Sequence, residues 1–129
     1  MKRVLALVLV VLSVGAFGSK VSANDFKSAV IAGGGSLPTI NVSDNQFLII
    51  RTFTQQGSGA TQRGLVMITI LNGVTLPTPQ NVLSASIVPT DTTAIEPVNS
   101  IVVAGPATVA VTCPDASATC FVTYRKESN

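Results

Sequence analysis

The chain of 129 residues holds eight basic and six acidic residues, two cysteines, no histidine and no tryptophan. Nucleic-acid binding requires clustered Lys and Arg side chains that neutralise phosphates, and the sequence has no such cluster, which excludes that class. Without histidine there is no Ser–His–acid or Cys–His catalytic group and no ordinary zinc site. We therefore expect a protein that is not an enzyme and that holds no metal and no cofactor.

The N-terminal segment has the parts of a secretory signal, namely the basic residues Lys2 and Arg3, an apolar run over residues 4–14 and a small-residue cleavage pattern. The apolar run is shorter than the roughly 20 residues that a membrane-spanning helix needs. The sequence therefore predicts a signal peptide over residues 1–23 and a secreted or periplasmic mature chain over residues 24–129, without a membrane span. A retained membrane anchor is the alternative.

The signal segment carries Lys2, Arg3 and Lys20, which leaves five basic residues against six acidic residues in the mature chain. Charged residues are thus much rarer than the about one quarter usual in soluble domains. The polar surface must consist mainly of Thr, Ser, Asn and Gln side chains. Such a surface repels copies of itself only weakly, so that self-association carries a small electrostatic cost.

The mature segment is rich in β-branched residues, since Val, Ile and Thr supply 35 of its 106 residues, and these pack well on a pleated sheet. No stretch repeats apolar residues at helical spacing. We expect a single all-β domain, a two-sheet β-sandwich or jelly roll of about eight short strands. The expected strands cover residues 26–31, 39–42, 46–54, 64–71, 74–76, 82–88, 98–104, 107–113 and 119–125.

Breakers separate these strands. Asn72-Gly73 favours a type I′ hairpin turn, and Pro77 and Pro79 are expected to end a strand. The glycines at 33–35 are expected to form a hinge after the first strand, because glycine tolerates many backbone conformations.

Cys113 and Cys120 are the only cysteines, and export favours a disulfide between them. We expect them to face each other in a C-terminal hairpin, with a structural role, because no Cys-x-x-Cys motif or activating base accompanies them. Alternation then places Val122 and Tyr124 on the core face with the cystine and leaves Phe121 as the exposed ring.

Two strands are apolar on both faces, residues 47–50 and 65–71. Either they are central strands covered on both sides, which we favour, or one face is a subunit contact. Arg51 lies inside such a strand and is expected to reach the surface.

The segment 55–63 joins these two strands and is longer than a minimal hairpin loop, which makes it a candidate binding loop. A solvated connector without a binding role is the alternative. A second candidate loop covers residues 89–97. The polar side chains of the first loop that we single out are Gln55, Gln56, Ser58, Thr61, Gln62 and Arg63.

Most acidic residues fall in predicted turns, where Asp commonly accepts hydrogen bonds from nearby backbone, as Asp115 is expected to do. A catalytic carboxylate pair and a calcium site at Asp91 and Glu96 are the alternatives. Without Trp, an aromatic sugar-binding platform is not expected.

Three functional hypotheses remain. The first is a non-catalytic structural or assembly protein of the cell exterior or periplasm, which associates with itself or another extracellular protein through sheet edges. In its sharpest form, residues 24–35 carry a strand that is exchanged between subunits. The second is an extracellular module that binds a glycan or peptide through loops 55–63 and 89–97. The third is a small carboxylate hydrolase.

Overall fold

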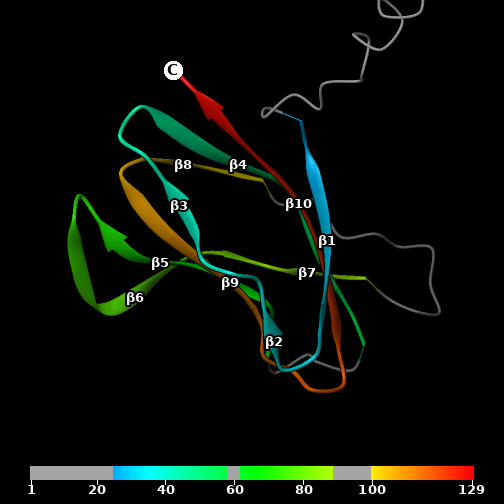
Figure 1. The fold of residues 1–129 in the computed structure, drawn as a ribbon. Helices are drawn as coiled ribbons and strands as arrows, with labels where there is room; N and C mark the ends of the chain where they lie inside the picture. The colour runs from blue at the N-terminus through cyan, green and yellow to red at the C-terminus, as the bar shows by residue number, and fades with distance from the viewer. Residues whose placement is uncertain (1–24, 58–61, 89–99) are drawn as a thin grey trace, which may run out of the picture.

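In the computed structural model, the chain folds as two β-sheets packed face to face (Figure 1), and the structure describes residues 25–57, 62–88 and 100–129. The strands within these ranges number ten, and no helix occurs among them. The prediction of an all-β two-sheet sandwich is confirmed. The predicted signal peptide and the loop 89–97 lie outside the described residues.

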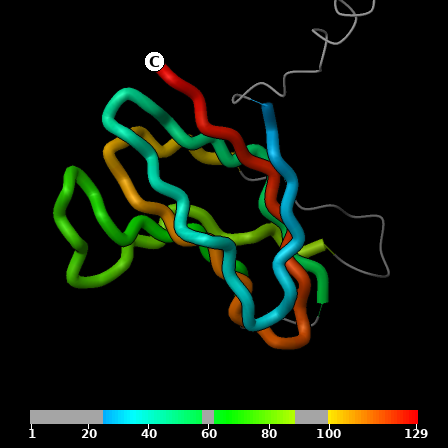
Figure 2. Tube along the Cα trace, in the orientation of Figure 1, coloured from blue at the N-terminus to red at the C-terminus, as the bar shows by residue number. Residues whose placement is uncertain are grey.

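The first sheet, here called sheet A, joins the two ends of the chain, because the first strand pairs antiparallel with the last (Figure 2). Its order is β1-β10-β4-β7, and β8 pairs with the other half of β4. The short β7 runs parallel to β4, whereas the other pairs are antiparallel. Its strands are β1 (Lys27–Ala32), β4 (Gln46–Gln56), β7 (Ser86–Val88), β8 (Ile101–Ala104) and β10 (Thr119–Ser128).

The second sheet, sheet B, has the order β2-β9-β5-β6, and β3 pairs with the other half of β9. All its pairs are antiparallel. The hairpin of β5 and β6 extends away from the body of the sandwich, at the left of Figure 1. The strands of sheet B are β2 (Gly35–Ser36), β3 (Ile40–Val42), β5 (Leu65–Leu71), β6 (Val74–Ser84) and β9 (Ala107–Cys113).

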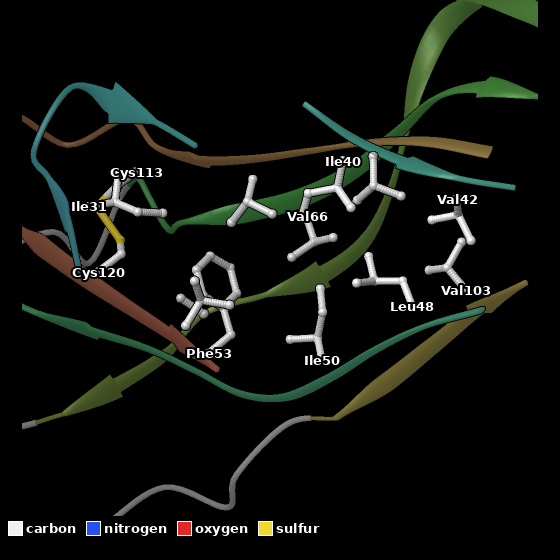
Figure 3. Packing of buried hydrophobic residues seen from close by; sticks show 14 of the residues in the cluster. Ile31, Ile40, Val42, Leu48, Ile50, Phe53, Val66, Val103, Cys113 and Cys120 are labelled. Atoms are coloured by element: carbon white, nitrogen blue, oxygen red, sulfur yellow. A yellow bond between two sulfur atoms is a disulfide. The ribbon is translucent and has the colours of Figure 1, made fainter. Parts of the chain in front are cut away.

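The core is a single layer of side chains between the two sheets (Figure 3). It begins at the cystine beside Ile31, continues through Phe53 and Val66, and ends at Val42 and Val103. The alternation in β9 is complete, since residues 107, 109, 111 and 113 are buried and those between them are half-buried. Burial of such an apolar layer provides most of the favourable free energy of folding.

β4 contains a β-bulge at Arg51. The register pairs Thr123 with Thr52 but Tyr124 with Ile50, so that Arg51 has no partner in β10. The extra residue shifts the alternation of inward and outward side chains in β4 by one position. Ile50 and Phe53 therefore both face the core at 0 % exposure, and Arg51 reaches the surface as predicted.

The outward residues of the two-faced strands, such as Ile49 and Met67, are half-buried. Our preference for strands covered on both sides is therefore wrong for the described residues, which form two layers only.

The C-terminal cysteines form a disulfide, as predicted, but the expected hairpin is wrong. Cys113 ends β9 in sheet B, whereas Cys120 lies in β10 of sheet A, so the bridge connects the two sheets. The short segment between them turns from one sheet to the other. The cystine nevertheless faces the core with Val111 and Val122, as alternation indicated, because both sheets turn their inner faces toward each other.

The glycine segment after β1 is a tight crossing from sheet A to sheet B. A Cβ atom on Gly33 would lie 2.5 Å from the carbonyl oxygens of Asp115 and Ala116, which leaves no room for a side chain. The N–H of Gly34 donates a 2.7 Å hydrogen bond to the carbonyl oxygen of Cys113. These contacts hold residues 33–35, which we expected to form a hinge, against the segment after Cys113.

The turn of the projecting hairpin is as predicted, with Asn72 at φ 51° and Gly73 at φ 77°, which fits type I′. The prediction that Pro77 and Pro79 end a strand is wrong, since β6 continues through both. Because β6 is an edge strand, a proline facing its open side removes no ladder hydrogen bond. The register shifts here, between the pairs Ile68–Gln80 and Ile70–Thr75.

Candidate functional site

The predicted binding loop is held at its base by one of its own residues, Gln55. This side chain lies in β4 at 0 % exposure. Its Nε2 donates a 3.2 Å hydrogen bond to the carbonyl oxygen of Gln62, and its Oε1 accepts a 2.7 Å bond from the N–H of Gly64. Gln55 therefore joins the two ends of the loop. Its side chain is buried and does not reach the surface where a ligand would bind.

Unlike Gln55, the other predicted loop residues that the structure describes are exposed. Gln56, Gln62 and Arg63 are exposed, and Arg63 donates a 3.5 Å hydrogen bond to the carbonyl oxygen of Ala85. Ser58 and Thr61 lie outside the described residues, as does the second loop with Asp91 and Glu96. The structure thus fixes the base of the first loop, and its binding role stays a prediction.

The described acidic residues are Asp25, Asp44, Asp115 and Glu127. Asp115 accepts hydrogen bonds from the N–H and Oγ of Ser117, at 2.9 and 2.8 Å, which confirms its predicted place in a turn. These bonds hold the pKa of the Asp115 carboxyl below its usual range. Glu127 pairs with Arg125 at 2.9 Å. No group of three potential metal ligands occurs within residues 25–57, 62–88 and 100–129.

The edge formed by β1 is the most distinctive surface of the sandwich. β1 pairs with β10 through six consecutive residues, from Lys27–Tyr124 to Ala32–Thr119. On its other side, no strand in the described part of the chain pairs with it. An open edge of this kind presents backbone N–H and C=O groups that can accept another strand.

The long edge strand of sheet B is protected in ways that β1 is not. β6 contains Pro77 and Pro79 and has two shifts of register against β5. Prolines and bulges are common devices that prevent edge-to-edge pairing. β1 has no proline, no bulge and only one charge, Lys27 at its first position. The remaining edge strands that the structure describes have two to four residues each.

An apolar pair lies on the outer face beside the β1 edge. Val30 of β1 is 68 % exposed and is paired with Phe121 of β10, which is 38 % exposed. The prediction that Phe121 is an exposed ring is confirmed. Large exposed apolar side chains in contact mark association surfaces more often than single ones do.

Two shallow hollows lie near the β3 edge. One, of about 290 Å³, is lined by β3, by the β5–β6 turn and by the segment around Pro106. The other, of about 320 Å³, lies between sheets A and B, next to the first residue of β1. We call the second hollow the lysine groove, because Lys27 and Lys126 both line it.

No protein-family profile matches the chain, and no curated protein resembles it in sequence. In the part of the chain that the structure describes, no helix is long and apolar enough to cross a membrane. The disulfide fits a protein located outside the cytoplasm, where oxidising conditions preserve such bonds.

Proposed function

We propose that the protein is a non-catalytic structural or assembly protein of the cell exterior or periplasm, and that it associates with itself through the free edge of β1. The observation that carries this proposal is the contrast between the two long edges. Prolines and register shifts make the backbone edge of β6 irregular, whereas β1 has six consecutive residues in regular pairing and one charge. Two copies of β1 in antiparallel pairing would make sheet A continuous across both domains.

The chemistry of β1 favours a second copy of itself as its partner. The strand reads Lys-Ser-Ala-Val-Ile-Ala, and its single charge lies at one end. In antiparallel pairing about the middle of the strand, the two lysines lie at opposite ends and do not repel each other. The mature chain is also nearly neutral, with five basic and six acidic residues. Both properties lower the electrostatic cost of association.

The expected association is weak. Stable interfaces bury about 1,200–2,000 Å² in total, and one pair of six-residue strands buries less. Val30 and Phe121 of both copies add apolar area next to the new strand pair. We therefore expect an oligomer whose population rises with protein concentration.

Edge pairing explains the structure around Gly33 better than exchange of the first strand does. Exchange requires the 33–35 segment to leave the carbonyl groups of Asp115 and Ala116 against which Gly33 packs. Edge pairing leaves these contacts in place. It also keeps Ile31, which is 4 % exposed, in its own core.

The experiment is a measurement of solution mass by light scattering over a range of concentrations, with protein purified after export. Val30→Lys places a charge on the β1 edge, and Val74→Lys, at a similarly exposed site in β6, is the matched control. We expect the first variant to stay monomeric and the control to associate as the unsubstituted protein does. A monomer at every concentration, or equal loss in both variants, would overturn the proposal.

A further inference from the structure

We propose that the lysine groove is a docking site for an extended peptide segment of another protein, with an acidic side chain held between Lys27 and Lys126. This site shares only Lys27 with the β1 edge and does not depend on self-association. The proposal follows from the charge of the groove, its floor and the strand beside it.

The groove has two cationic walls. Lys27 begins β1 and is the register partner of Tyr124 in β10, and Lys126 follows two residues later on the same side of β10. Both lysines are exposed, and neither forms an ion pair with any residue that the structure describes. Lys126 Nζ donates a 3.3 Å hydrogen bond to the carbonyl oxygen of Asn41, which holds the ammonium group at the boundary of the two sheets.

The floor of the groove includes the apolar surfaces of Tyr124 and Ile40. Tyr124 is half-buried and packs against the core, and Ile40 is 8 % exposed. Pro38 lies on the opposite side, in the segment that leads into β3. An apolar floor between two ammonium groups suits a short side chain that ends in a carboxylate, because the chain packs while the charge is paired.

The strand beside the groove favours a peptide over other anions. β1 covers β10 only as far as Tyr124, whereas β4 pairs with β10 through to Ser128. Phe26, which directly precedes β1, lies against Arg125, so residues 126–128 of β10 have a neighbouring strand on one side only within the described structure. A segment in extended conformation can pair with this open length of β10 and place one side chain in the groove.

The neighbouring Arg125 is not available for the same role. Its guanidinium already pairs with Glu127 at 2.9 Å. Alternation along β10 places Arg125 and Glu127 on the other face from Lys126. Among the basic residues of β1 and β10, Lys27 and Lys126 are thus the two without an ion pair in the described structure.

The probe is a seven-residue peptide with capped ends, Thr-Val-Thr-Asp-Val-Thr-Val, and its matched control carries Asn in place of Asp. We expect the Asp peptide to shift the NMR signals of Tyr124, Lys126 and Asn41, and to bind about five-fold more tightly than the Asn peptide, as two exposed ion pairs predict. Lys27→Gln combined with Lys126→Gln should remove this difference, and the corresponding double Arg variant should retain it.

The same titration is repeated on Val30→Lys, whose change lies on the outer face of sheet A. Binding retained in this variant supports a site independent of the β1 edge. Equal affinity for the Asp and Asn peptides, no shift at all, or shifts confined to residues 28–31 would overturn the proposal. Binding of a sulfated oligosaccharide to these amides, without binding of the Asp peptide, would also overturn it.

Discussion

The guanidinium carbon of Arg125 lies 4.6 Å from the centre of the Phe26 ring, and that of Arg51 lies 5.8 Å from the same ring. Phe26 directly precedes β1, so two cation–π contacts secure the beginning of the edge strand to β10 and β4. The bulge that turns Arg51 outward makes one of these contacts possible.

Replacing Phe26 with Leu should loosen the beginning of β1, because an aliphatic side chain keeps apolar contact but not the cation–π attraction. Each such contact at an exposed site contributes about 0.5–1 kcal/mol. We expect faster amide hydrogen exchange at Lys27 and Ser28. Phe121→Leu is the control, since it changes an exposed ring of the same sheet and leaves the Phe26 contacts in place. Equal exchange rates in both variants would contradict this role of Phe26.

Gln55→Leu should lower the free energy of unfolding by about 1–3 kcal/mol, since it leaves the buried N–H of Gly64 without its acceptor. The neighbouring Gln56 is exposed, so Gln56→Leu should change stability by less than about 0.5 kcal/mol. Urea denaturation of both variants measures the difference. If the two substitutions cost the same, the amide of Gln55 does not hold the base of the loop.

Removing the disulfide by Cys113→Ala and Cys120→Ala together should lower the free energy of unfolding by about 2.5 kcal/mol, from the entropy of the short closed loop. Because the bridge joins the two sheets, we also expect faster hydrogen exchange near Ile31, which packs beside it. Thermal denaturation and exchange measure the two effects. Unchanged stability in the double variant would show that the cystine does not clamp the sandwich.

Local patterns in the sequence predicted the strands, the type I′ turn and the inward face of the cystine, because alternation and turn chemistry act over a few residues. Sheet membership was not predictable in this way. Cys113 and Cys120 lie on strands of different sheets, because β9 pairs with β5 and β10 pairs with β1. Both of these partner strands are distant in the sequence. The bulge at Arg51 is also not predicted, and its only signal in the sequence is that the apolar residues Ile50 and Phe53, which both face the core, lie three positions apart rather than two.

The candidate site was predicted only in outline. Association through a sheet edge was expected from low charge and a separate first strand. The sequence does not indicate which edges are protected, because prolines such as Pro77 and Pro79 occur both at strand ends and within edge strands. The lysine groove was missed entirely, since Lys27 and Lys126 are 99 residues apart and meet only through β1–β10 pairing.

Asp115 should titrate below its ordinary pKa of 3.8, because the N–H and Oγ of Ser117 bond to the charged form. Its stabilising contribution is thus complete above the ordinary pKa and is lost as the pH falls through the lower pKa of the folded state. NMR titration of the carboxyl group in Ser117→Ala should give a higher midpoint. Ser128→Ala, at the end of β10, should leave the midpoint unchanged.

The most direct test of self-association through β1 is amide hydrogen exchange of the purified protein at low and high concentration. Unpaired edge amides exchange rapidly, and pairing with a second copy protects them. We predict that protection of residues 27–32 rises with concentration while that of β6 stays constant. Protection of β1 that does not change with concentration, or a rise confined to β6, would contradict the account.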